Sequence, residues 1–208
     1  AKILYNHIYH SKLPKQFIDV IYKDKRYKDI IKHRNFNPRI IEFITDSSVI
    51  GDIKSENYWT YIHQSLNNPE VIWEGYFQNQ TDDFVRALTF LTVFNNGKIS
   101  EESLRDSYNT YLRIHPLNFG DNSDKSFESV RKLATKSLLN RNHIDDEKYE
   151  YVLFNPSIAD FVLSAYSNEI DLICNILKSL NSEASIDYLH TLLRNNKINK
   201  NYTSRILE

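Results

Sequence analysis

The sequence is poor in cysteine and glycine and contains no methionine. Cys174 is the only cysteine among 208 residues, which excludes an internal disulfide and indicates a reducing compartment. It lies on an apolar helical pattern, so we expect a buried, unreactive thiol. The four glycines, Gly51, Gly75, Gly97 and Gly120, belong to no phosphate-cradling loop, which excludes a P-loop and a dinucleotide-binding fingerprint in this sequence.

Long apolar runs are also absent. The sequence has neither a signal peptide nor a stretch of 18 apolar residues, so nothing indicates secretion or membrane insertion, and we expect a cytoplasmic protein. A helical pattern begins at once with Ile3 and Leu4, and no capping residue or leader comes before it. We therefore interpret the chain as an internal fragment of a longer protein.

The charge is nearly balanced overall but unevenly distributed. The net charge of −1 argues against polyanion binding by the chain as a whole. Residues 1–50, however, hold ten Lys/Arg against five Asp/Glu, and the other 158 residues hold 16 against 22. The basic character is therefore concentrated in the first quarter of the chain.

Helical spacing dominates the first quarter. Apolar residues recur at helical intervals in 2–11, 14–24, 26–33 and 37–46, which predicts a small all-helical bundle. Ser and Gly residues near position 50 mark a break. We therefore predict a helical subdomain at residues 1–50.

The middle of the chain changes period once. Helices are expected after Thr81 and Ser100 as N-caps and again at 126–140, followed by two strands around the turn "DDEK" at 145–148. Helices followed by one hairpin predict a winged helix at about 70–168, within a domain that includes leading helices and spans 51–168. Residues 169–208 are then C-terminal helices that either begin a helical repeat or form a linker. The predicted fold class is mainly α.

Chemistry-bearing clusters are scarce. His7 and His10 lie one helical turn apart, but no acidic residue or Cys accompanies them at ligand spacing, so we predict no metal site. The carboxylate pairs at 82–83, 101–102 and 145–146 fall at helix starts or a turn, where capping explains them. The chain holds no complete active site, and we expect no enzymatic activity from it alone.

The predicted winged helix invites a nucleic-acid hypothesis. Its third helix and the following segment carry Arg131, Lys132, Lys136 and Arg141. The wing, in contrast, carries four carboxylates that would repel a phosphate backbone: Asp145, Asp146, Glu147 and Glu150. Nucleic-acid binding is therefore an alternative function and not the favoured one.

Three stretches carry a family resemblance. "ILYNHIYHSKLP…YKDIIKHRNFNPRIIEFIT", "NPEVIWEGYF" and "FNPSIADFVLSAY" resemble the lid and winged-helix portion of bacterial STAND NTPases, especially the novel STAND group of multidomain defence proteins. The resemblance covers nearly all of residues 1–170. It implies a regulatory module of a parent ATPase that uses ATP/ADP with Mg, and it implies coupling of nucleotide state to domain rearrangement. The expected partners are the missing P-loop domain and, after activation, further copies of the parent.

The resemblance also implies site residues. Asn37, Pro38 and Arg39 match the lid motif in which an arginine at a helix start approaches the nucleotide phosphates. Helix N-termini and guanidinium groups both attract anions, which agrees with a phosphate-sensing role. Asn-Pro also begins two other predicted helices, so the dipeptide is mainly a helix start, and local sequence alone would leave Arg39 solvated.

A second motif is matched less closely. In the wider family the winged helix ends in a motif whose His touches the diphosphate, and Asn155 occupies that position here, followed by Ser157. An Asn N-cap alone accounts for this pattern, so we favour capping over nucleotide contact. The third alternative for the whole chain is a helical protein-interaction platform that begins at residues 169–195.

Overall fold

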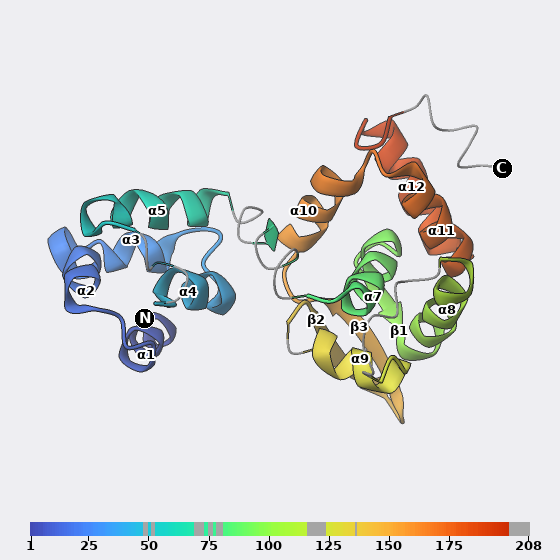
Figure 1. The fold of residues 1–208 in the computed structure, drawn as a ribbon, viewed down its shortest axis with the longest axis horizontal. Coiled ribbons are helices and arrows are strands. Elements are labelled where there is room, and N and C mark those ends of the chain that lie inside the picture. The colour runs from blue at the N-terminus through green and yellow to red at the C-terminus, as the bar shows by residue number, and fades with distance from the viewer. Residues whose placement is uncertain are drawn as a thin grey trace. The chain divides into compact units, whose positions relative to one another are not determined.

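The chain consists mainly of helices. The computed structural model describes residues 1–47, 50, 53–68, 73–74, 77, 81–115, 124–135 and 137–199, without the Arg39 side chain. In these ranges the helices accompany one small three-stranded antiparallel sheet (Figure 1). The predicted fold class, mainly α with a β-hairpin, is confirmed. The chain divides into two compact units, Ala1–Gly75 and Tyr76–Glu208, which we describe one at a time.

The N-terminal unit is a bundle of short amphipathic helices. In this bundle α1 packs against α4, and α5 packs against both α2 and α4. Pro14 and Pro38 stand at helix starts, where a missing N–H costs nothing. The elements are α1 (Lys2–His10), α2 (Lys15–Tyr22), the 3₁₀ helix η1 (Lys23–Lys25), α3 (Tyr27–Lys32), α4 (Pro38–Thr45) and α5 (Ser55–Asn67).

Tyr58 joins α5 to the rest of this bundle. Its ring is fully buried and meets Phe17 of α2 edge to face, with ring centroids 4.7 Å apart. Its hydroxyl donates a hydrogen bond of 2.6 Å to the Ile44 carbonyl at the end of α4. We predicted that the first domain ends at residue 50, but α5 completes its core, and the boundary lies after residue 75.

The C-terminal unit contains the sheet. Its chain order is α7 (Asp83–Phe94), β1 (Lys98–Ser100), α8 (Glu101–Ile114), α9 (Phe127–Ala134), β2 (Leu139–Asp145), β3 (Lys148–Leu153), α10 (Ser157–Tyr166), α11 (Ile170–Leu180) and α12 (Glu183–Arg194). The strands lie in the order β1-β3-β2, all antiparallel. This order of helices and strands is that of a winged helix.

The sheet corrects one expectation. The hairpin β2–β3 was predicted, but β1 was not, because three residues are too few to reveal an alternating pattern. Ile99 is the buried member of β1 and pairs with the fully buried Tyr151 of β3. Gly97 precedes the strand at φ +81°, a conformation that disfavours any residue with a side chain.

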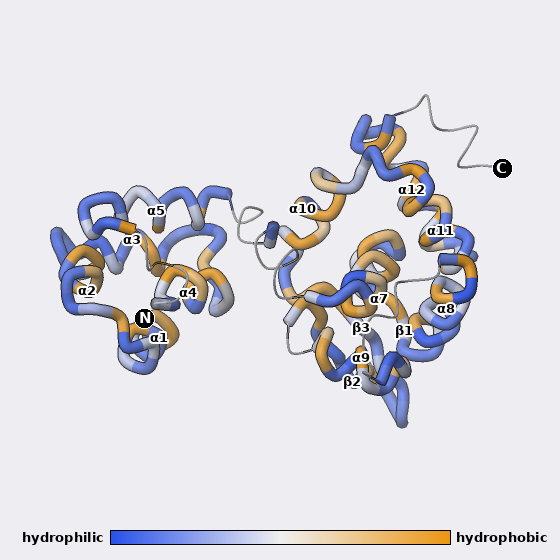
Figure 2. Tube along the Cα trace, in the orientation of Figure 1, coloured by the Kyte–Doolittle hydropathy of each residue, from blue (hydrophilic) through white to orange (hydrophobic). Residues whose placement is uncertain are grey.

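The apolar helix α7 lies at the centre of the C-terminal unit. Arg86 is the exception among the residues from Phe84 to Phe94, and the other ten are all buried. Figure 2 shows α7 as a largely hydrophobic segment. It contacts α8, α9, α10, α11, α12 and the sheet. Across the described ranges, no helix combines the length and apolar character that crossing a bilayer requires.

The last helices belong to the same core. We predicted residues 169–208 as a separate region, but α11 packs against α7 and α8, and α12 packs against α7. Cys174 is buried in α11, as its apolar pattern predicted. Within residues 169–199, therefore, the chain completes the winged-helix unit. The end of the predicted region, 200–208, lies outside the described residues.

Two predicted N-caps have different outcomes. Ser100 caps α8, since its Oγ accepts a hydrogen bond of 3.1 Å from the Ser103 N–H. The prediction of Thr81 for α7 is wrong. Asp82 caps that helix by accepting 2.8 Å from the Val85 N–H, while Thr81 is buried one residue earlier. An ionised carboxylate is the stronger acceptor at a helix N-terminus.

Candidate functional site

The predicted phosphate-sensing site lies at the start of α4. Asn37 has extended backbone angles, and its side-chain oxygen accepts a hydrogen bond of 3.0 Å from the Ile40 N–H. Pro38 follows at the first helical position and is exposed. Asn37 therefore acts as the N-cap, which is the local role that the sequence predicted for it.

A chain of hydrogen bonds fixes the loop ahead of α4. The Asn37 amide donates to the Asn35 carbonyl (3.1 Å), and the Asn35 amide donates to the Leu66 carbonyl near the end of α5 (2.8 Å). The His33 ring also lies within 3.2 Å of the Asn67 side-chain oxygen. The start of α4 is thus held to α5 by side-chain amides at several points. A helix start held in this way can present a fixed N-terminus.

The capping leaves few free backbone N–H groups at the start of α4 to bind an anion. Pro38 has no N–H, and the Ile40 N–H is taken by Asn37. At most the Arg39 N–H is left in the first turn, so any hold on a phosphate would depend on the Arg39 guanidinium. The Arg39 side chain lies outside the described residues, and its predicted role stays a prediction.

The second predicted motif lies at the start of α10. The Asn155 side-chain oxygen accepts hydrogen bonds from both the N–H and the hydroxyl of Ser157, at 2.9 and 2.8 Å. Both side chains are half-buried. Each therefore has a local partner, which favours a local structural role of Asn155 over nucleotide contact, although Pro156 stands at the N-cap position of α10 and Asn155 one residue before it. Asn155 belongs to the C-terminal unit and Asn37 to the N-terminal unit.

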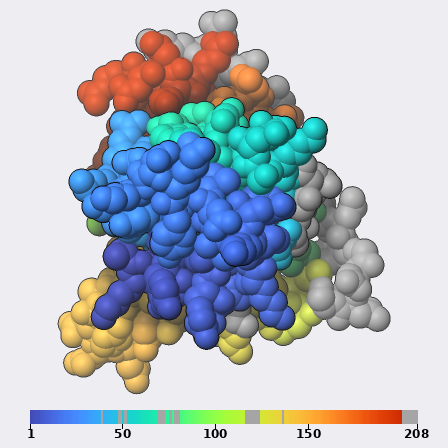
Figure 3. Space-filling view, turned by 90° about the vertical axis from the view of Figure 1, so that its left-hand side faces the viewer, coloured from blue at the N-terminus to red at the C-terminus, as the bar shows by residue number. Residues whose placement is uncertain are grey.

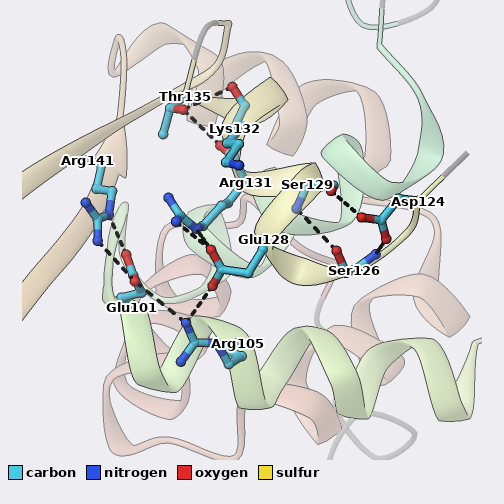
Figure 4. A network of polar contacts seen from close by, with 10 residues as sticks. All are labelled: Glu101, Arg105, Asp124, Ser126, Glu128, Ser129, Arg131, Lys132, Thr135 and Arg141. Atoms are coloured by element: carbon cyan, nitrogen blue, oxygen red, sulfur yellow. Dashed lines mark hydrogen bonds and ion pairs between the residues drawn. The ribbon is translucent and has the colours of Figure 1, made fainter.

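A polar network of the C-terminal unit escaped prediction from the sequence. It joins the start of α8 to α9 and β2 (Figure 4). Arg141 of β2 donates two hydrogen bonds to the Glu101 carboxylate, at 2.5 and 3.1 Å. These bonds hold the pKa of Glu101 below its ordinary value, although partial burial acts the other way. The same pairing raises the pKa of Arg141.

The second half of the network centres on Glu128 of α9. Arg105 of α8 donates to it at 2.8 Å, and Arg131 of α9 donates at 2.6 Å. The hydrogen bonds from Arg131 and Arg105 lower the pKa of Glu128. Because Arg105 also lies 3.7 Å from Glu101, a chain of alternating charges runs from Arg141 to Arg131.

This network changes the meaning of the basic residues near α9. Arg131 and Arg141 were candidates for phosphate contact, and each is instead paired with a carboxylate of its own unit. Lys132 is exposed, and Lys136 lies outside the described residues. The wing tip exposes Asp145, Asp146 and Glu147. The third helix and wing therefore offer little net positive charge.

The histidines of α1 line a pocket of the N-terminal unit. This pocket, of about 340 Å³, lies between α1 and α4 and is bounded by His7, His10, Glu42 and Asp46, among others. Glu42 comes from α4 and Asp46 from its C-cap, which spacing within α1 alone does not reveal. Within the described ranges, no group of three or more His, Cys, Asp or Glu side chains is arranged to hold a metal ion.

The sequence contains one weak signal for the missed network. Glu101, Arg105 and Arg131 stand at helix positions where ion pairs commonly form, but their partners across the fold lie as far as 40 residues away.

Comparison with protein-family models, curated proteins and solved structures finds no match to this chain, so its membership of the STAND family stays a prediction.

Proposed function

We propose that this chain is the lid and winged-helix module of an ATP-dependent signalling NTPase of the STAND type. In bacterial defence such a module would couple the nucleotide state of the parent protein to a rearrangement of its domains. The chain itself would be non-catalytic, because its sequence has no phosphate-cradling loop. ATP or ADP, with Mg, would be held mainly by the P-loop domain of the parent.

One observation carries this proposal. The start of α4, with Arg39 in its first turn, is fixed by the Asn37 cap and by the Asn35 amide bonded to α5. A side chain meant to sense a phosphate needs a rigid base, because a misplaced charge contributes little to binding. The local excess of Lys and Arg in residues 1–50 adds a favourable potential for an anion.

The proposal assigns one interaction to Arg39. Its guanidinium would contact the outermost phosphate of a nucleotide bound to the P-loop domain. Hydrolysis would release that phosphate and so remove a contact between the two domains. The two domains could then adopt a different arrangement. Asn37 and Pro38 would set the direction of the helix start without touching the nucleotide.

The two alternatives receive less support. A nucleic-acid interface on α9 would need free cations, but Arg131 and Arg141 are neutralised by Glu128 and Glu101. A repeat platform would need C-terminal helices that stack outward, but α11 packs back onto α7 and α8. Both alternatives are therefore weaker than the nucleotide-switch proposal.

The test uses the full polypeptide that contains this chain. We expect Arg39→Ala to lower nucleotide-dependent activity, measured as ATP turnover and as the ATP-induced change in protease sensitivity. Arg34→Ala is the matched control, because Arg34 is an exposed arginine in the turn just before α4. Its activity should equal that of the wild type.

Three results would overturn the proposal. The first is a parent sequence with no GxxxxGK[ST] motif upstream of this chain, because no domain would then supply the phosphates. The second is wild-type turnover and switching in Arg39→Ala. Equal loss in Arg39→Ala and Arg34→Ala would also count against it, since a general charge effect would explain both.

A further inference from the structure

An exposed pair of aromatic rings lies along α1. Leu4 and Ile8 of this helix are buried against the bundle, while Tyr5 and Tyr9 are 59% and 71% exposed. The two tyrosine rings lie stacked, with centroids 6.2 Å apart and planes inclined by 15°. The rings therefore form an aromatic surface on the outer face of a helix whose inner face is well packed.

Cations stand at both ends of this aromatic pair. Lys2 precedes Tyr5 by three residues, Tyr9 follows Tyr5 by four, and Lys12 follows Tyr9 by three, beyond the helix end. This spacing places Lys2, Tyr5 and Tyr9 on one stripe of the helix surface, and Lys12 follows in the turn beyond the helix end, with φ +54°. Both lysines are exposed, and neither has an ion-pair partner among the described residues.

The surroundings of the stripe are also basic. The first 18 residues contain no Asp or Glu, and Lys15 begins α2. Glu42 and Asp46 line the same pocket as His7 and His10 of α1. His7 lies about 160° around the helix from Tyr5, so this histidine faces away from the tyrosine pair.

In the described ranges the lysines around α1 have no ion pair, and neither has the exposed Lys178 of the C-terminal unit, whereas several arginines of that unit are paired. Four arginines of the C-terminal unit are paired with carboxylates: Arg86, Arg105, Arg131 and Arg141. The lysines of α1, η1 and α3 are exposed and have no such pairs among the described residues. Figure 3 shows the first residues, in the darkest blue, at the surface of the N-terminal unit.

We propose that the stripe Lys2-Tyr5-Tyr9-Lys12 binds single-stranded nucleic acid. Tyr5 and Tyr9 would stack on exposed bases, and the two lysines would contact the phosphates on either side. Stacking on aromatic rings combined with a positively charged track is the usual way in which proteins hold single strands without reading their sequence. The net charge of −1 concealed this surface, because it averages the basic first quarter with an acidic remainder.

The chemistry favours a single strand over the other polyanions. A duplex hides the faces of its bases, so the tyrosine rings would gain nothing from it. An acidic protein would satisfy the lysines but would give no reason for two parallel stacked rings, whereas a single strand offers phosphates and base faces together; tyrosines also partition into membrane interfaces, so the test includes anionic vesicles. This binding surface goes beyond the proposed nucleotide switch and does not depend on Arg39.

The test measures fluorescence anisotropy of labelled oligonucleotides. The chain is titrated into oligothymidylate and oligouridylate of about twenty nucleotides and into a duplex of the same length. We expect the single strands to bind more tightly than the duplex. Tyr5→Ala/Tyr9→Ala should weaken single-strand binding by about tenfold or more. Tyr22→Ala, which removes an exposed tyrosine from α2, is the control and should leave the affinity unchanged.

Salt dependence tests the lysines separately. Lys2→Ala/Lys12→Ala should reduce the slope of log affinity against log salt by about 1.4, since each phosphate contact on a single strand contributes about 0.7. Lys178→Ala, an exposed lysine of α11, should not change that slope. Circular dichroism should show unchanged helix content in every variant, because all the replaced side chains are exposed.

Three results would overturn the proposal. One is the absence of single-strand binding by the wild-type chain at low salt. Another is equal binding of duplex and single strand with no effect of the tyrosine replacements, which would leave only general charge attraction. The third is tyrosine-dependent sedimentation with phosphatidylserine vesicles in the absence of oligonucleotide binding, which would assign the stripe to a membrane surface.

Discussion

Arg141 of β2 and Glu101, the first residue of α8, form a two-point ion pair across 40 residues of sequence. The Arg141 guanidinium also lies over the Tyr149 ring, 3.2 Å from its centroid. One side chain of β2 therefore contacts both the start of α8 and the neighbouring strand β3. Both members are partly shielded from water, at 27% and 16% side-chain exposure, so the pair should stabilise more than a surface salt bridge does.

Replacement of Arg141 by alanine should destabilise the chain. It removes both hydrogen bonds and the ring contact and leaves the Glu101 carboxylate half-buried without its main partner. We expect the free energy of unfolding to fall by about 1–3 kcal/mol in urea titrations. Lys132→Ala, on the exposed side of α9, is the control and should change it by less than about 0.5 kcal/mol. Equal effects of the two variants would show that the pair contributes nothing specific.

The same network predicts a loss of stability in acid. The pKa values of Glu101 and Glu128 are lowered in the folded chain by their arginine partners. A lowered folded pKa gives stability that is fully present above the unfolded value of about 4.3 and is lost as the pH falls through the lower folded value. Urea midpoints should therefore decline below about pH 4.3.

Glu101→Gln separates this contribution from general acid unfolding. The variant should be less stable at neutral pH but should lose less stability between neutral pH and acid than the wild type. Glu102→Gln changes an exposed neighbour and should reproduce the wild-type pH profile. If Glu101→Gln keeps the full acid dependence, other groups must cause it.

Tyr58 should be sensitive to loss of a single oxygen atom. Burial raises the pKa of its phenol well above the ordinary value, and its hydroxyl satisfies the Ile44 carbonyl. Tyr58→Phe would leave that carbonyl unsatisfied in the bundle core, which should cost about 1–2 kcal/mol of unfolding free energy. Thermal unfolding checks this, with the exposed Tyr22→Phe as control. An unchanged melting temperature for Tyr58→Phe would mean that water takes the place of the hydroxyl.

Local signals in the sequence predicted local structure well. Asn37 and Ser100 cap their helices as expected, since a cap depends on residues only three positions apart. The hairpin could also be predicted from the sequence, because the residues from Tyr149 to Leu153 alternate in polarity. The Thr81 prediction failed by one residue, where two good capping types stand side by side. The strand at 98–100 has too few residues to show any period.

Contacts between distant residues were not predictable in this way. Nothing in the spacing of Tyr58 indicates that it bonds to Ile44, so the domain boundary was placed too early. The partner of Arg141, 40 residues away, was not predictable for the same reason, whereas Glu128 lies only three residues before Arg131 and could have been recognised as its helical partner. Of the candidate site, the sequence predicted the cap of α4 and a local role for Asn155 before α10, but not the amides that hold the start of α4 to α5.

The sheet order has a consequence for the hairpin. The three residues of β1 reach along β3 only as far as Glu150, so the hairpin beyond that residue is a ribbon of two strands, with a bulge between His143 and Asp145. A two-stranded ribbon in water is marginally stable, and it can open without disturbing the three-stranded base. Amide protons near the tip should exchange before those of the base. The turn at Asp146 and Glu147 is accordingly the place where a peptide tag or a fluorophore can be inserted while the rest of the unit stays folded.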